Sequence, residues 1–375
     1  MKPDGVEHRT PPRPVNRRDL FRFRTGSTGT AAPDAMPQAP TSASDRNESA
    51  ARGGIINASR PLMGSYFEVR VGSGVPGAVD LATRALDVVE AIEAWMTVYD
   101  DSSEVSEVNA SAHLAPVRVG EDLFRVLRRA IEINRATGGA FDPTAGALSL
   151  AWGFTRGPKR VPDVATLADA RSRTGSNLVE LDLENQTVRF RKPGVVLNFG
   201  SIGKGYAVDR AVDVIRSHWW PTSTLIHGGR SSLFALGSPP DDFGGRWAVA
   251  LTDPDHPDDS LGTIHLRNRG MATSGSSFQR FEAGGRSFGH IIDPRTGEPP
   301  QGASTSVTVL APTAAEADAL STAFYLLGPD KSAPILADRP EVAALFVDRG
   351  GPGGSARVVP FHLTTADYSP GPTRA

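Results

Sequence analysis

Hydrophobic and polar residues repeat with two different periods along this chain, and the two periods predict helices and strands. Apolar residues recur every three or four positions over residues 76–96 and 121–136, which predicts two amphipathic helices. Pro76 suits the first turn of the earlier helix, and Gly138 and Gly139 are expected to end the later one. Two further helices are expected over residues 204–217 and 314–327.

Other segments alternate with a period of two, as half-buried strands do. Residues 66–71 alternate polar with apolar side chains, and residues 178–190 do so on both sides of a turn at 184–186, which predicts a hairpin. Because hairpins are mixed with separate helices, the pattern favours an α+β fold of mixed or antiparallel sheets with flanking helices. Further strands are expected over residues 224–226, 246–251, 262–266, 304–310, 343–347 and 356–360.

The ends of the chain differ in composition from its middle. Pro, Ser, Thr, Ala and Gly dominate residues 1–55 without periodicity, which is typical of a disordered, basic tail. We expect one folded domain over residues 56–362 and a C-terminal tail over 363–375. With 375 residues, of which 39% are hydrophobic, the chain is long enough to bury a large core.

Charge and cysteine content exclude several classes of function. The formal net charge of -2 argues against a surface that binds nucleic acid or membrane over the whole molecule. No apolar run reaches 18 residues, so we expect no transmembrane helix. The absence of cysteine excludes disulfides, thiolate nucleophiles, cysteine-bound zinc and a lipid-bearing cysteine.

The compartment is not fixed by the sequence. Residues 16–22 resemble a twin-arginine export signal, but the apolar segment that should follow is replaced by Arg, Gly, Ser and Thr. A basic tail and a cytoplasmic location are therefore favoured, with export as the alternative.

The segment His290–Gly297 carries the densest chemistry in the chain. It places an imidazole, a carboxylate, a guanidinium and a hydroxyl in eight residues, and Pro294 and Gly297 restrict its backbone to a turn. A histidine in such a loop can be a purely structural residue. Its proximity to Asp293 and Arg295 favours a general base, with the carboxylate orienting the ring. Asp293, Arg295 and Thr296 are candidate ligand contacts, and the alternative for Arg295 is to hold the loop by pairing with Asp293 or with a carbonyl.

Two glycine-rich segments, 198–207 and 227–232, and a hydroxyl-rich segment, 271–277, indicate an anionic ligand. The first ends a strand and begins a helix with Lys204, so its N–H groups and the helix dipole suit a phosphate, although it is neither a P-loop nor a dinucleotide motif. Each segment is equally compatible with an ordinary turn. The candidate ligand contacts in the other two segments are Gly228, Gly229, Ser274 and Gly275.

Asp318 and Thr322 stand four residues apart on a predicted helix and so face the same side. A carboxylate and a hydroxyl suit Mg²⁺, which needs few protein ligands when phosphates supply the rest. The same spacing also occurs on ordinary amphipathic helices. Two more segments, 99–109 and 139–154, combine turns with aromatic residues and suit either an aromatic ligand or a packed loop.

In this order, these segments resemble the FAD:protein FMN transferase family, the ApbE-like flavin transferases. The resemblance covers about residues 60–350, and its most specific motifs are His290–Gly297, Gly203–Asp209, Gly139–Thr144 and Ala317–Thr322. It implies an α+β fold that binds FAD and Mg²⁺. It also implies transfer of FMN from FAD to a threonine or serine hydroxyl of an acceptor protein, with release of AMP.

The resemblance also implies roles for individual residues. His290 matches the base that deprotonates the acceptor hydroxyl, and the acceptor is expected to carry a flavinylation motif of the type Asp-Gly/Ser-x-Thr-Ser/Ala-Thr. Asp318, Thr322 and the carbonyl of Gly203 match metal ligands. The positions expected near the flavin or the adenine are Met63, Tyr99, Asn109, Asp142 and Lys204.

The chain departs from the family pattern at several positions. Asn198 stands where the family usually has Asp, Gly203 replaces Ala, Arg230 replaces Asn or Asp, and Ser276 and Ser277 replace a frequent Asp-Tyr pair. These departures concern the residues expected to contact the flavin and the acceptor protein more than the assignments of the base and the metal ligands. Two alternatives to transfer stay open: an FAD pyrophosphatase that gives FMN and AMP, and a non-catalytic flavin-binding protein.

Overall fold

The computed structural model describes most of the chain from residue 54 onward. The expected N-terminal tail and its twin-arginine segment lie outside the described residues, and strand β1 begins at Ile55. The described ranges are 54–218, 223–229, 231–242, 245–256, 258–275, 280–300, 305–348 and 356–371.

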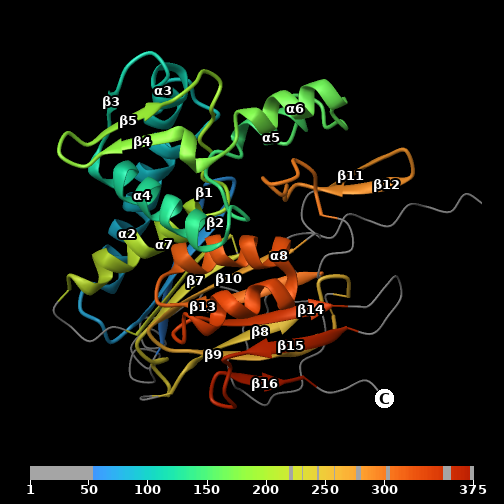
Figure 1. The fold of residues 1–375 in the computed structure, drawn as a ribbon. Coiled ribbons are helices and arrows are strands. Elements are labelled where there is room, and N and C mark those ends of the chain that lie inside the picture. Colours follow the sequence, from blue (N-terminus) through green and yellow to red (C-terminus); the bar gives the residue numbers. More distant parts are fainter. Residues whose placement is uncertain are drawn as a thin grey trace, which may run out of the picture.

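A sheet of eight strands forms the centre of the molecule, and every neighbouring pair in it is antiparallel. This sheet, shown in Figure 1, confirms the predicted α+β class. In spatial order its strands are β1 (Ile55–Leu62), β2 (Ser65–Gly72), β6 (Thr224–Gly228), β7 (Ser232–Leu236), β10 (Arg269–Gly275), β13 (Ser306–Ala311), β14 (Ala343–Asp348) and β15 (Arg357–Phe361).

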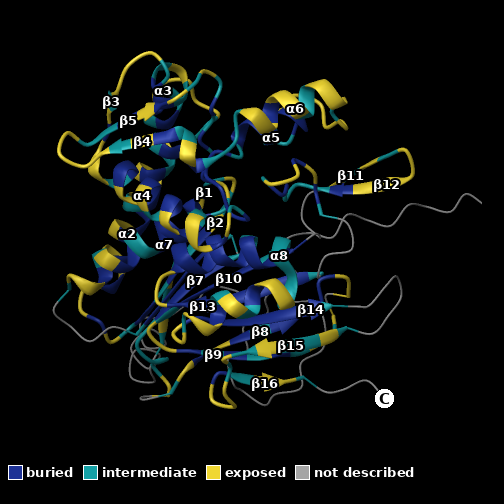
Figure 2. Cartoon of the chain, in the orientation of Figure 1, coloured by how far each residue is buried: buried dark blue, intermediate teal, exposed yellow. Residues whose placement is uncertain are grey.

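Three helices cover one face of this sheet and close the main hydrophobic core. Helix α2 (Ala78–Met96) packs on β1 and β2, α7 (Gly203–Arg216) on β6 and β7, and α8 (Ala314–Ala337) on β10 and β13. Figure 2 shows their inner faces buried against the sheet. Helix α8 is kinked at Gly328, which has a φ of 73°. Gly328 is one residue beyond 327, where the helix was predicted to end. None of the described helices is both long and apolar enough to cross a membrane.

A three-stranded sheet covers the opposite face. It consists of β8 (Trp247–Thr252), β9 (Ser260–Leu266) and β16 (Tyr368–Pro370), and its apolar residues pack against those of β6, β7 and β14. Strand β16 falls within residues 363–375, the segment expected to be a tail, and it pairs with β9 up to Pro370. The sandwich of two sheets therefore includes chain beyond the expected domain end.

A smaller layer of helices and strands packs outside α2 and α7. The predicted hairpin over residues 178–190 is confirmed as the antiparallel pair β4 and β5, and the predicted helix over 121–136 is α4. Gly138 and Gly139 both have positive φ after the last turn of α4, as expected of a helix end. The elements of this layer are α3 (Glu104–Ser111), β3 (Val117–Arg118), α4 (Glu121–Ala136), the 3₁₀ turn Ser176–Leu178, β4 (Val179–Asp182) and β5 (Thr187–Phe190).

A hairpin lies to one side of the main sheet and precedes the His290 segment directly. Its strands β11 (Arg280–Ala283) and β12 (Arg286–Gly289) pair Phe281 with Phe288. Both rings contact the buried Trp152, which follows helix α5 (Gly146–Ala151) and precedes α6 (Val164–Ser172). Figure 1 shows this hairpin beside α5, away from the sandwich.

One local prediction was wrong in detail. Pro76 was expected within the first turn of α2, but Gly77 is the N-cap, with φ of 69°, and the helix begins at Ala78. The left-handed conformation of Gly77 turns the chain into the helix after the proline. Pro76 therefore precedes the helix.

Candidate functional site

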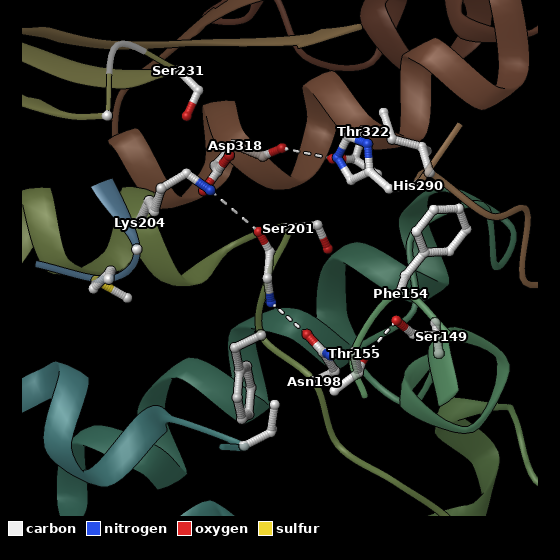
Figure 3. A pocket seen from close by; sticks show the side chains of 18 of the residues that line it. Ser149, Phe154, Thr155, Asn198, Ser201, Lys204, Ser231, His290, Asp318 and Thr322 are labelled. Atoms are coloured by element: carbon white, nitrogen blue, oxygen red, sulfur yellow. Dashed lines mark hydrogen bonds between the residues drawn. The ribbon is translucent and has the colours of Figure 1, made fainter. Parts of the chain in front are cut away.

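A cavity of about 520 Å³ lies between the first turn of α7, the middle of α8, the end of β10 and the loop after α5. Cavities of roughly 300–1,000 Å³ are the usual size of small-molecule sites. Residues from segments far apart in the sequence meet there, as Figure 3 shows. The sequence-predicted residues that line it are Met63, Tyr99, Asp142, Lys204, Gly229, Ser274, Gly275, His290, Asp318 and Thr322.

Lys204 marks the cationic side of this cavity. It lies in the first turn of α7, and its Nζ donates to the carbonyl of Gly200 at 3.4 Å. In Figure 3 its ammonium points toward Asp318. The ammonium and the N-terminus of α7 together make this wall attractive to an anion.

Asp318 is a buried carboxylate on α8, with 5% of its surface exposed. It accepts the backbone N–H of Gly205 at 3.0 Å, so it links α8 to the first turn of α7. Burial raises its pKa, while the charge of Lys204, the Gly205 N–H and the hydroxyl of Ser232 lower it. Since burial is the largest of these effects, a cation added to the cavity would stabilise the ionised form.

Hydroxyl groups continue the polar wall beyond Asp318. Ser274 Oγ lies 3.1 Å from Thr322 Oγ1 and 2.9 Å from Ser321 Oγ. Thr322 and Ser321 also donate to the Asp318 carbonyl, at 3.4 and 2.9 Å. The end of β10 and one face of α8 thus present several neutral oxygen atoms beside one carboxylate.

His290 reaches the cavity from the loop that follows β12. Figure 3 shows its ring next to Thr322. Two contacts hold the end of this loop: Trp152 Nε1 donates to the Gly297 carbonyl at 2.8 Å, and the Gly297 N–H donates to the Asp293 carbonyl at 2.7 Å. The ring therefore projects from a loop that is anchored to the core at its far end.

Asp293 and Arg295 shape this loop and do not line the cavity as described. Arg295 donates to both carboxylate oxygens of Asp293, from Nε at 2.9 Å and from a terminal nitrogen at 2.7 Å. The pair, expected as ligand contacts, is instead the alternative that the sequence allowed, an internal brace. Thr296, also expected at the ligand, accepts the Glu298 N–H at 3.2 Å within the same turn.

Three further expected contacts, Asn109, Gly228 and Gly203, are not part of the described lining of the cavity. The Asn109 amide pairs with both backbone groups of Leu197, at 3.1 and 2.7 Å. Gly228 lies against Phe67, whose ring a Cβ would approach to 2.6 Å. Gly203, expected as a metal ligand, packs against Met96, whose Sδ would be 2.5 Å from an added Cβ.

Asp142 lines the cavity, but its carboxylate accepts hydrogen bonds from neighbouring protein groups. It accepts the N–H and hydroxyl of Thr144 at 2.8 and 2.6 Å, the N–H and hydroxyl of Ser176, and the amide of Asn134 at 2.9 Å. It therefore fixes the cavity wall. Arg230, Ser276 and Ser277 lie outside the described residues.

Sequence reasoning missed a polar group on the opposite wall. Ser149 Oγ and Thr155 Oγ1 lie 2.6 Å apart, and Asn198 reaches Thr155 at 3.5 Å while it accepts the Gly200 N–H at 2.8 Å. Figure 3 shows the group across the cavity from Asp318. Asn198 could have been identified from its place in the glycine-rich segment 198–207, whereas Ser149 and Thr155 belong to no recognisable motif. Glu93 and Met96, at the end of α2, also line the cavity and were expected only as helix residues.

The oxygen donors are sparse for a metal site made by protein alone. Within the described residues, no group of three or more His, Cys, Asp or Glu side chains could hold a metal ion. Asp318 and Thr322 nevertheless line one cavity, and the carboxylate is buried at a cost that a cation would offset. This donor set fits a cation whose remaining ligands come from a substrate's phosphates and water.

Comparison with known proteins agrees with this geometry. The model of the ApbE family matches residues 63–346. A protein of Treponema pallidum named FAD:protein FMN transferase is 32% identical over 76% of this chain and 82% of its own length. One of the same name from Haemophilus influenzae is 30% identical over 79% and 87%. The crystal structure of an ApbE protein from Thermotoga maritima has a TM-score of 0.74 at 29% identity, over 81% of this chain and 96% of its own. This chain belongs to the ApbE family.

Proposed function

We propose that the protein transfers FMN from FAD to a threonine or serine hydroxyl of an acceptor protein and releases AMP. One observation carries the proposal: His290, Lys204 and the Asp318–Thr322 pair, from three distant segments, line a single cavity. A base, a cation and oxygen donors are what attack on a pyrophosphate requires. The names of the relatives from Treponema pallidum and Haemophilus influenzae support the same reaction.

His290 is the base in this proposal. Its ring would take the proton of the acceptor hydroxyl as that oxygen forms a bond to the phosphorus of the FMN half. The bond between this phosphorus and the bridging oxygen breaks, and AMP leaves with the bridging oxygen. Because the loop of His290 is braced by Asp293 and Arg295, little ordering is required for this step.

Lys204 and the first turn of α7 face the phosphates in this arrangement. The ammonium would donate to pyrophosphate oxygens, and the helix N-terminus would favour the charge that develops on the leaving phosphate. Asp318 and Thr322 would hold Mg²⁺, which supplies further neutralisation of the pyrophosphate when bound. The charge of the Lys204 ammonium also favours the ionised form of the Asp318 carboxylate.

The aromatic end of FAD has a separate wall available. Tyr99, Phe154 and Met63 line the cavity beyond the polar groups, and Tyr99 is 67% exposed. An exposed aromatic ring at a cavity mouth gains from stacking against a flat heteroaromatic ligand. The hydroxyl and amide group of Ser149, Thr155 and Asn198 would supply hydrogen bonds on the facing wall.

Transfer and hydrolysis of FAD differ only in the nucleophile, so one experiment separates them. The protein is incubated with FAD, Mg²⁺ and a peptide of the motif Asp-Gly-Ala-Thr-Ser-Thr, then denatured and analysed by mass. Transfer predicts a peptide heavier by one FMN and one AMP released per modified peptide. Free FMN with an unmodified peptide would identify a pyrophosphatase, and intact FAD would identify a flavin-binding protein.

A further inference from the structure

Two loops from distant parts of the sequence contribute aromatic side chains to the wall of the large cavity. Residues 97–103, after α2, contribute Tyr99, and residues 153–160, after α5, contribute Phe154. In the described part of the chain, neither loop pairs with a strand. The spacing of the two aromatic side chains therefore depends on contacts that the loops make themselves.

The loop that carries Tyr99 is fixed in shape by its own hydrogen bonds. Ser103 Oγ donates to the Thr97 carbonyl at 2.5 Å, and the Ser103 N–H donates to the Asp100 carbonyl at 3.2 Å. The Asp100 carboxylate in turn accepts the N–H and the hydroxyl of Ser102 at 2.9 and 2.7 Å. The loop is therefore a compact unit, and Tyr99, which is 67% exposed, is carried on it.

The loop that carries Phe154 is closed on itself as well. The Arg160 N–H donates to the Trp152 carbonyl at 3.1 Å, and Gly153 has a φ of 74°. A Cβ on Gly153 would lie 2.2 Å from the Pro158 carbonyl oxygen, so the two ends of this loop are in close contact. This loop is therefore also a compact unit.

Arg156 joins the two loops. A terminal nitrogen of its guanidinium donates to the Val98 carbonyl at 2.8 Å and to the Asp101 carboxylate at 3.0 Å. Within the described residues, no other side-chain hydrogen bond joins these loops. Val98 and Thr155, the neighbours of Tyr99 and Arg156, line the cavity, whereas Arg156 itself is not part of the described lining. The link therefore connects two segments of the wall from outside the cavity.

The contact with the carbonyl is expected to matter more than the ion pair. The side chains of Arg156 and Asp101 are 48% and 90% exposed, and ion pairs at such positions contribute little to stability. A hydrogen bond from a charged donor to a backbone carbonyl is stronger, and here it fixes the residue that directly precedes Tyr99.

We propose that Arg156 is a positioning residue, which holds the Tyr99 loop at the spacing from Phe154 that admits a flat ring of FAD between the two loops. The inference rests on the proposed function and adds to it a residue that acts on the substrate only through the cavity wall. A preset spacing reduces the ordering that binding requires. Loss of the link should therefore weaken the binding of FAD and leave the chemical step unchanged.

Arg156→Gln removes the link, and Arg160→Gln is the matched control. The control removes a charge of the same sign from the same loop, but the backbone N–H of Arg160, which closes the loop, is unchanged. FAD binding is measured by flavin fluorescence. We expect the dissociation constant to rise about five- to tenfold for Arg156→Gln and less than about twofold for Arg160→Gln. Peptide labelling at saturating FAD should keep its kcat in both variants.

Two results of this comparison would overturn the proposal. One is an unchanged dissociation constant for FAD in Arg156→Gln. The other is an equal rise in both variants, because that would make the effect one of net charge and not of the link.

Hydrogen exchange of the free protein tests the link without any ligand. The backbone amides of residues 98–103 should exchange faster in Arg156→Gln than in the wild type, because the loop opens more often. Arg160→Gln should exchange like the wild type. Unchanged exchange of residues 98–103 in Arg156→Gln would show that the link does not hold the loop, which would also overturn the proposal.

The chain has no cysteine, so a chemical crosslink can take the place of the arginine. The double variant Asp101→Cys and Arg156→Cys carries the only two thiols and should bind FAD about five- to tenfold more weakly than the wild type. Joining the thiols with bismaleimidoethane should restore the dissociation constant to within about twofold of the wild type. A dissociation constant that stays raised after crosslinking would contradict a positioning role.

Two fragments of FAD identify the ring that enters between the loops. If the ring is the isoalloxazine, Arg156→Gln should weaken the binding of FMN and leave that of AMP unchanged. If it is the adenine, AMP binding should weaken and FMN binding should stay the same. A variant that binds both fragments as tightly as the wild type would overturn the proposal.

The outcomes separate this inference from the function on which it rests. If the wild-type protein binds FAD but labels no peptide, the transfer is excluded, and the binding constants alone decide the role of Arg156. If the wild-type protein labels the peptide and Arg156→Gln binds FAD equally well, only the positioning role is excluded.

Discussion

Asp209 and Asp318 each accept backbone N–H groups from the first turn of the other's helix. Asp318, on α8, accepts the Gly205 N–H of α7 at 3.0 Å. Asp209, on α7, accepts the N–H groups of Ala314 and Ala315 of α8 at 2.7 and 2.8 Å. Because each carboxylate satisfies donors at a helix N-terminus, the two helices are held in one register. Lys204 and Asp318 depend on this register for their places in the cavity.

Gly205 tests how closely the two helices must approach. A Cβ at this position would lie 2.2 Å from the Ala314 carbonyl oxygen, a backbone atom that cannot move aside alone. We expect Gly205→Ala to lower the free energy of unfolding by about 1–3 kcal/mol and to reduce flavin transfer. Urea titration measures the first effect. Gly74→Ala, where a Cβ meets nothing within 4 Å, is the control, and equal stability of both variants would contradict the tight approach.

Asp318→Asn separates a metal ligand from a structural residue. The amide oxygen can still accept the Gly205 N–H, and removal of a buried charge relieves its desolvation, so the melting temperature without metal should hold or rise. Turnover should fall at least 10²-fold, and its stimulation by Mg²⁺ should disappear. Asp330→Asn, an exposed position on the same helix, is the control. A large loss of melting temperature with Mg²⁺ stimulation intact would count against the assignment.

Arg295→Lys tests whether this residue braces the loop or binds FAD. A lysine ammonium cannot replace the two parallel hydrogen bonds to Asp293, so the His290 loop should loosen. We expect kcat to fall by about tenfold with little change in the KM for FAD. Arg286→Lys is the matched control. The opposite split, a raised KM for FAD with kcat retained, would make Arg295 a ligand contact.

The lowered pKa of Glu68 predicts how the free energy of unfolding depends on pH. Burial raises its pKa, but hydrogen bonds from His227 and Arg70 outweigh burial and lower the pKa to about 2. A carboxyl with a lowered folded-state pKa stabilises the fold above its unfolded value and loses this contribution as the pH falls toward 2. The stability difference between wild type and Glu68→Gln should therefore be full at pH 7 and shrink below about pH 4.5.

Chemical unfolding at pH 7 and pH 3 measures that difference. Glu90→Gln serves as the control, because the Glu90 side chain is 62% exposed and its ion pair with Arg60 lies at the surface. A difference for Glu68→Gln that stays constant between pH 7 and pH 3 would contradict the lowered pKa.

The elements that could be predicted are those whose own residues fix their structure. Helices α2 and α4 carry complete apolar stripes, and the turn between β4 and β5 interrupts a clear period of two. Strand β10 was expected only as a hydroxyl-rich turn, because Gly, Thr and Ser dominate its sequence. It is a strand because β7 and β13 satisfy its backbone groups from both sides.

The residues of the candidate site also fall into two groups, those that the local sequence identifies and those that only the fold places. The glycine-rich and histidine segments could be found because their residue types restrict backbone and chemistry locally. Asn109 and Gly228 could not be placed, because Leu197 and Phe67, their partners, lie far away in the sequence. Ser149 and Thr155 could not be predicted from their local sequence, because only the fold places their hydroxyls in the wall of the cavity.

The most direct test of the account is flavin transfer by His290→Ala. Single-turnover labelling of the Asp-Gly-Ala-Thr-Ser-Thr peptide is measured at saturating FAD, and FAD binding is measured separately by flavin fluorescence. A base that removes the acceptor proton predicts labelling slower by on the order of 10²-fold or more with FAD affinity retained. Labelling at the wild-type rate would remove His290 from the mechanism.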